Sequence, residues 1–88
     1  MNPDDIAARI RGILPDAQID LVGADCHFEV AIVSDKLQGQ SQLARQRMVL
    51  ELFRQELGTG ALHALSVRAH TSTEVEAAKQ AALNLSVR

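Results

Sequence analysis

The sequence predicts an α+β fold, an α/β sandwich in which a three-stranded mixed sheet carries helices on one face. The 88 residues suffice for one modest core, so we expect a single domain over residues 1–88. Hydrophobic spacing alternates between the period of helices and that of strands, in the order helix, strand, strand, helix, strand, helix. The long connection before the third strand allows it to pair in parallel through a right-handed crossover.

The first half of the chain predicts a helix followed by a hairpin. Asn2 can cap the first helix, and Pro15 ends it. Apolar residues recur along one side of this helix at Ile6, Ile10, Ile13 and Leu14. Residues 18–22 and 28–34 then alternate as two strands around a turn at residues 23–26, a pattern typical of an antiparallel hairpin.

A long helix is predicted after the hairpin. Ser41 can cap its start, and the glycines at 58 and 60 permit the left-handed turn that ends it near residue 57. Its apolar residues include Leu43, Leu50, Phe53 and Leu57. The arginines on the remaining surface, which predict a basic helix face, are Arg45, Arg47 and Arg54.

The third strand begins near residue 62 and carries the residue of greatest chemical interest, His63. Because side chains alternate along a strand, His63 should lie on the same side as Leu65 and Val67. A capping box at Thr71 and Glu74 then opens a last, Ala-rich helix to about residue 84. We expect His70, just before it, to be a solvated residue with no role.

Composition disfavours several classes of protein. Residues 1–39 carry three basic and seven acidic side chains and residues 40–88 carry six and four, so a strongly basic nucleic-acid footprint is missing. The two phenylalanines are too few for a base-stacking surface. No apolar run approaches the ~18 residues of a membrane span, and the acidic N-terminus is unlike a secretory signal. We expect a cytoplasmic protein in which the single cysteine, Cys26, is a reduced thiol.

Five short motifs follow one another at a characteristic spacing. They are HFEV at residues 27–30, LQGQS at 37–41, RQR at 45–47, LHALSV at 62–67 and TSTEV at 71–75. Their order resembles that of the BolA-like family, most closely its short IbaG-like branch. The sequence departs from the family pattern at Leu37, Gln46, Ser72 and Val75, where the family has an aromatic residue, His, Pro and Trp.

The resemblance implies a fold similar to a type II KH domain, a monothiol glutaredoxin as partner and a [2Fe–2S] cluster shared with it. Such a cluster needs four ligands, usually thiolates, although histidine can replace cysteine on one iron. One cysteine and three histidines cannot form a four-thiolate site, so a partner must complete the ligand set. The resemblance assigns that role to the glutaredoxin thiolate and a bound glutathione.

His63 is the ligand that the resemblance implies on this chain. The second ligand should come from the loop between the first two strands, where Cys26 and His27 both lie. We favour Cys26, because a thiolate is the stronger ligand for an iron–sulfur cluster, and His27 remains the alternative. Because imidazolium cannot bind iron, cluster binding should weaken in acid.

The resemblance implies an adaptor for cluster trafficking or for iron, redox or acid-stress regulation. We expect no enzymatic activity, since no phosphate loop, metalloprotease motif or nucleophile–base motif is present. The alternative is a KH-like nucleic-acid-binding transcriptional regulator whose Arg45, Arg47 and Arg54 contact phosphates of DNA or RNA weakly. The KH Gly-x-x-Gly loop is incomplete here, because only Gly39 is present. A homodimer of the apo form is left open.

Overall fold

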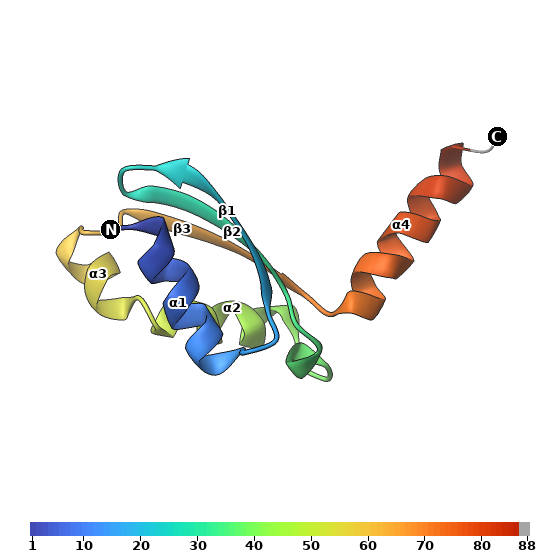
Figure 1. Ribbon diagram of the computed structural model, residues 1–88, viewed down its shortest axis with the longest axis horizontal. Coiled ribbons are helices and arrows are strands. Elements are labelled where there is room, and N and C mark those ends of the chain that lie inside the picture. Colours follow the sequence, from blue (N-terminus) through green and yellow to red (C-terminus); the bar gives the residue numbers. More distant parts are fainter. Residues whose placement is uncertain (87–88) are drawn as a thin grey trace.

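The computed structural model describes residues 1–86, with side chains up to residue 83 (Figure 1). Its helices are α1 (Pro3–Ile13), the short 3-10 helix η1 (Asp35–Leu37), α2 (Gln42–Glu51), α3 (Arg54–Thr59) and α4 (Ser72–Ser86). Its strands are β1 (Gln18–Ala24), β2 (His27–Val33) and β3 (Ala64–His70). No helix within residues 1–86 has both the length and the apolar character needed to cross a membrane.

The three strands form one mixed sheet in the order β1-β2-β3, as the sequence predicts. β1 and β2 are antiparallel, whereas β2 and β3 are parallel. Helices α1, α2 and α3 cover one face of this sheet and leave the other face open (Figure 1). The core lies between these layers and includes Ile6, Ile10, Phe28, Val30, Ile32, Val49, Phe53 and Leu62.

The predicted long helix is broken in two, which corrects the expectation of one helix to residue 57. α2 ends at Glu51, and α3 starts only at Arg54. At the break the Leu52 carbonyl accepts a hydrogen bond of 3.0 Å from Arg9 of α1, whose guanidinium lies 5.3 Å from the centre of the Phe53 ring. Leu43, expected to face the sheet, is instead 56% exposed, while Phe53 is fully buried.

The same Arg9 guanidinium holds α3 through a second residue. It donates two hydrogen bonds, of 2.7 and 2.9 Å, to the two carboxylate oxygens of Glu56. These bonds hold the pKa of Glu56 below its ordinary value. Arg9 thus holds the chain on both sides of the break between α2 and α3, because its N–H groups contact the Leu52 carbonyl and the Glu56 carboxylate at the same time.

Helix α4 stands away from the rest of the chain, which corrects the expectation that all helices lie on one face. Figure 1 shows it extending from the far end of β3, and the Cα trace measures 49 × 25 × 21 Å. Its first turn is nevertheless well defined. Thr71 Oγ1 accepts from the Glu74 N–H at 3.2 Å, and a Glu74 oxygen accepts from the Thr71 N–H at 3.0 Å, which confirms the predicted capping box.

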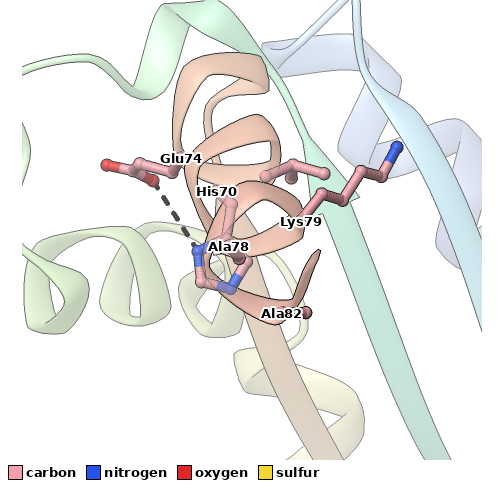
Figure 2. A pocket seen from close by; sticks show the side chains of 6 residues that line it. His70, Glu74, Ala78, Lys79 and Ala82 are labelled. Atoms are coloured by element: carbon pink, nitrogen blue, oxygen red, sulfur yellow. Dashed lines mark ion pairs between the residues drawn. The ribbon is translucent and has the colours of Figure 1, made fainter. Parts of the chain in front are cut away.

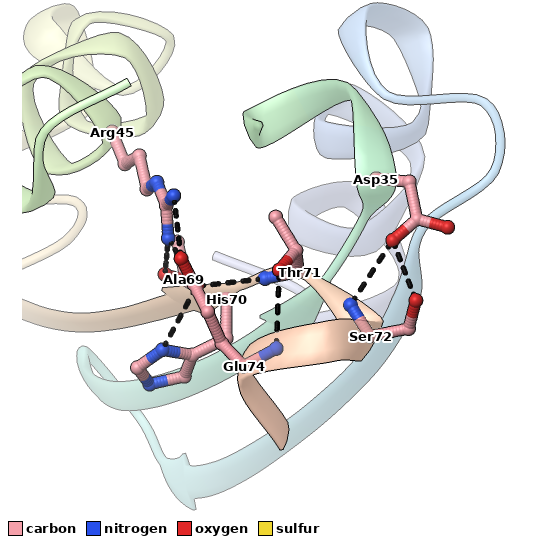
Figure 3. A network of polar contacts seen from close by, with 7 residues as sticks. All are labelled: Asp35, Arg45, Ala69, His70, Thr71, Ser72 and Glu74. Carbon is pink, nitrogen blue, oxygen red and sulfur yellow. Dashed lines mark hydrogen bonds and ion pairs between the residues drawn. The ribbon is translucent and has the colours of Figure 1, made fainter. Parts of the chain in front are cut away.

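The start of α4 is tied to α2 and η1 by the polar network of Figure 3. Arg45 of α2, only 3% exposed, donates to the Ala69 carbonyl at 3.0 Å and to both carboxylate oxygens of Glu74 at 2.6 and 3.0 Å. Asp35 of η1 accepts from the Ser72 N–H and hydroxyl at 3.0 and 2.6 Å. Two carboxylates therefore hold the first turn of α4, one through α2 and the other through η1.

Replacing Glu74 by Gln should remove part of the acid sensitivity of folding. Hydrogen bonding from Arg45, and next from the Thr71 N–H, lowers the pKa of Glu74 to about 2. The pKa of Glu74 is depressed in the folded state, so the ionised Glu74 carboxylate contributes its full stabilisation above the ordinary glutamate pKa. This stabilisation is lost as the pH falls through about 2.

The measurement is urea unfolding of both proteins at a series of pH values from 7 to 2. Gln can still close the capping box, so the comparison isolates the charge opposite Arg45. The wild type should be more stable at neutral pH and should approach the Glu74→Gln variant as the pH falls. A stability difference that stays constant over this range would contradict the assignment.

Candidate metal centre

Three candidate ligands meet at one end of the sheet, where the β1–β2 turn lies beside the start of β3. The His27 and His63 rings stack, with their centroids 5.6 Å apart and their planes 18° from parallel. The Cys26 sulfur lies 3.7 Å from Nδ1 of His27. We call Cys26, His27 and His63 the edge site. The structure thus brings together all three residues that the sequence singled out.

Backbone hydrogen bonds hold the two halves of the edge site together. The Cys26 carbonyl accepts from the His63 N–H at 2.7 Å and from the Ala64 N–H at 3.1 Å. β3 starts at Ala64, which lies opposite His27 in the parallel register, so the predicted start near residue 62 was early. His63 precedes the strand and is exposed, whereas Leu65 and Val67 pack against the core.

The turn that carries Cys26 depends on an unusual backbone at two positions. Asp25 adopts a φ of 59°, which Asp tolerates better than most residues. Gly23 has a φ of 129°, and a Cβ placed there would lie 2.2 Å from the His27 carbonyl oxygen. Only glycine lets the two strands approach so closely, so Gly23 helps to set the position of the edge site.

A Gly23→Ala variant should lose more than about 1 kcal/mol of stability, because alanine fits neither this φ nor the contact with β2. Gly12→Ala is the matched control. Gly12 lies inside α1, and a Cβ added there would have no neighbouring atom within 4 Å, so alanine should stabilise by about 0.5–1 kcal/mol. Urea unfolding measures both changes. A Gly23→Ala variant as stable as Gly12→Ala would refute this account of the turn.

The chemistry of the edge site suits a soft metal or an iron–sulfur cluster. Thiolate and imidazole are the ligands such centres use. His27 and His63 are exposed and Cys26 is half-buried, so a second molecule can reach them. Among the side chains of residues 1–83, no three or more His, Cys, Asp and Glu residues are arranged to hold a metal ion.

His70 lies at the opposite end of β3 from the edge site. It lines a groove of about 350 Å³ at the start of α4, with Val75, Ala78 and Lys79 (Figure 2). Its Nδ1 lies 3.7 Å from a Glu74 oxygen, an ion pair when the ring is protonated. His70 lies two residues before α4 and its side chain is 46% exposed, which agrees with the expected solvated residue at the start of the last helix, but it is also the last residue of β3 and has a charged neighbour in Glu74.

The predicted basic helix face does not form as a set of three arginines. Arg45 is buried against Ala69 and Glu74, so it is not available to phosphates, which corrects that expectation. Arg47 and Arg54 remain exposed, and Arg54 pairs with Glu51 at 3.3 Å. Helical periodicity predicted a solvent-facing Arg45. It could not reveal the burial of this side chain, because the residues that bury it come from β3 and α4.

Comparisons with known sequences agree with the motif order. Residues 16–74 match a family model described as "BolA-like protein". A BolA-like protein of Dictyostelium discoideum is 35% identical over 63 residues, which are 72% of this chain and 55% of that protein. BolA-like protein 1 of Mus musculus is 42% identical over 52 residues, 59% of this chain and 37% of that protein. The matched segments thus span about half, or less, of these curated relatives.

Solved structures show the same architecture. BolA1 from Arabidopsis thaliana superposes with a TM-score of 0.72 at 29% identity, covering 81% of this chain and 92% of that chain. The BolA domain of SufE1 from the same plant gives a TM-score of 0.72 at 28% identity, covering 84% and 98%. The mixed three-stranded sheet with its helices is therefore a fold that these proteins share.

Proposed function

This chain belongs to the BolA-like family, and from that premise we propose that it is an iron–sulfur adaptor that binds a monothiol glutaredoxin and shares a [2Fe–2S] cluster with it. The observation that carries the proposal is the meeting of Cys26, His27 and His63 at one accessible edge. We also propose that the chain belongs to the IbaG-like branch of the family, is located in the cytoplasm and has no catalytic turnover of its own.

The ligand arithmetic supports a shared cluster. A [2Fe–2S] cluster takes four protein-side ligands, and this chain would offer His63 together with Cys26 or His27. The glutaredoxin would offer its active-site thiolate and the thiol of bound glutathione. We favour Cys26 over His27 as the second ligand, since a thiolate binds iron more strongly than an imidazole when the thiol is deprotonated.

A histidine ligand suits a protein that passes its cluster on. Neutral imidazole binds iron, whereas imidazolium has no free lone pair, so acid should release the cluster from this chain. This behaviour supports a role in cluster trafficking or in iron, redox or acid-stress regulation. Because the His27 ring stacks on the His63 ring, both imidazoles lie side by side at the edge site.

The test is anaerobic reconstitution with a monothiol glutaredoxin, glutathione, ferrous iron and sulfide. The mixture is separated by size-exclusion chromatography, and iron and acid-labile sulfide are measured in each fraction. We expect a heteromeric complex with iron and sulfide in the ratio of a [2Fe–2S] cluster. Separate elution of the two proteins, or a complex without iron and sulfide, would contradict the proposal.

A further inference from the structure

We infer that Arg9 and Glu56 are positioning residues for His63, because they fix the end of α3 from which the chain enters the edge site. Arg9 lies in α1 and Glu56 in α3, so neither belongs to the edge site itself. The inference deepens the proposed function and rests on it, since His63 is the ligand on which that proposal mainly depends. It adds two residues that control the geometry of this ligand without binding the cluster.

Arg9 anchors the Glu56 side chain to the first helix. Its guanidinium donates to both carboxylate oxygens of Glu56, at 2.7 and 2.9 Å, and to the Leu52 carbonyl at 3.0 Å. Only 20% of the Glu56 side chain is exposed. A contact between a planar guanidinium and both oxygens of a carboxylate fixes orientation as well as distance. The position of Glu56 therefore depends on α1 as well as on the backbone of α3.

The backbone of the same glutamate holds the turn that leads to His63. The Glu56 carbonyl accepts hydrogen bonds from the Gly60 N–H and the Leu62 N–H, both of 3.1 Å. Gly60 adopts the left-handed conformation that commonly ends a helix, with a φ of 87°. Leu62 is fully buried in the core. Because His63 follows Leu62 directly, Glu56 fixes the point from which the histidine starts.

The His63 ring itself lies against this turn. A Cβ placed on Gly60 would be 3.9 Å from Cε1 of the ring, an ordinary van der Waals contact. The ring also stacks on His27, with the centroids 5.6 Å apart, and the His63 N–H donates to the Cys26 carbonyl at 2.7 Å. A displaced end of α3 would therefore change how His63 lies relative to the other two residues of the edge site.

The chain contains a second contact of the same kind, which provides a matched control. Arg45 donates to both carboxylate oxygens of Glu74, at 2.6 and 3.0 Å (Figure 3). Glu74 lies in the first turn of α4, at the opposite end of β3 from the edge site. Removing either glutamate breaks a paired arginine–carboxylate contact, but only Glu56 is connected to His63. The comparison thus separates displacement of His63 from a general loss of stability.

The first experiment follows the imidazole signals of the isolated chain by nuclear magnetic resonance, with far-ultraviolet circular dichroism as a check on folding. Glu56→Ala should shift the two imidazole signals of the edge site and leave that of His70 in place. Glu74→Ala should do the reverse, because His70 lies 3.7 Å from Glu74. Glu56→Gln should give a smaller shift than Glu56→Ala, since its amide oxygen can still accept from Arg9.

The second experiment is anaerobic reconstitution of each variant with a monothiol glutaredoxin, glutathione, ferrous iron and sulfide, followed by visible circular dichroism. We expect Glu56→Ala to weaken the bands of the mixed cluster, because His63 no longer lies where the cluster needs it. Glu74→Ala should leave these bands at the intensity of the wild type.

Edge-site imidazole signals that keep their wild-type positions in both Glu56 variants would overturn the inference. Equal weakening of the mixed-cluster bands in Glu56→Ala and Glu74→Ala would also overturn it, because the loss would then reflect general destabilisation. If the Glu56 variants shift the imidazole signals but the wild type forms no mixed cluster, the proposed function fails, while Arg9 and Glu56 still position His63.

Discussion

A His63→Ala variant is expected to abolish the visible circular dichroism of the cluster that the wild-type chain shares with a monothiol glutaredoxin. Removing this imidazole leaves one iron without its protein ligand, and a methyl group cannot replace it. The stacked His27 ring would also lose its neighbour at 5.6 Å. We therefore expect loss of the mixed-cluster spectrum and a return to the spectrum of the glutaredoxin alone.

His70→Ala is the control for this experiment, since His70 lies at the other end of β3 and should leave the spectrum unchanged. Two further variants identify the second ligand. If Cys26 is the ligand, Cys26→Ala should alter the spectrum strongly while His27→Ala alters it weakly, and the order reverses if His27 ligates. A mixed-cluster spectrum that survives His63→Ala intact would remove His63 from the ligand set.

A Phe53→Ala variant is expected to cost about 3–5 kcal/mol of folding stability. Phe53 is fully buried in the core at the α2–α3 break, and its ring also lies beneath the Arg9 guanidinium. The total free energy of unfolding of a small domain is only about 5–15 kcal/mol, so the variant should be close to unfolding. Urea unfolding followed by far-ultraviolet circular dichroism measures the loss.

Leu43→Ala is the matched control for Phe53→Ala. The sequence pattern assigned both residues to the apolar side of one helix, but Leu43 is 56% exposed. Its replacement should change stability by less than about 0.5 kcal/mol. Comparable losses in the two variants would contradict the exposed position of Leu43 and the burial of Phe53.

Local chemistry made much of the fold predictable. The hairpin follows from alternating residues around a turn, and the predicted caps at Asn2 and Ser41 form as hydrogen bonds of 2.8 and 3.1 Å. These features depend on residues a few positions apart. The break between α2 and α3 depends instead on Arg9, which is 43 residues from Leu52 in sequence. No periodicity within residues 42–57 could reveal it.

The same distinction applies to the site. Cys26, His27 and His63 could be named from the sequence, because a motif resemblance and the donor chemistry pointed to them. Their arrangement could not be predicted, since it depends on the parallel register that puts His27 opposite Ala64. It also depends on the hydrogen bonds that the Cys26 carbonyl accepts from the start of β3. Arg45 shows the opposite case, in which helical spacing suggested a solvent-facing cation that β3 and α4 bury.

The most direct test of the shared cluster is pulsed electron paramagnetic resonance on its reduced form, with only this chain labelled by [15N]histidine. We expect a 15N hyperfine coupling of the size typical of an iron-bound imidazole, and none when the label is placed in the glutaredoxin instead. A reduced mixed cluster without 15N coupling from the labelled chain would contradict the claim that a histidine of this chain binds the cluster.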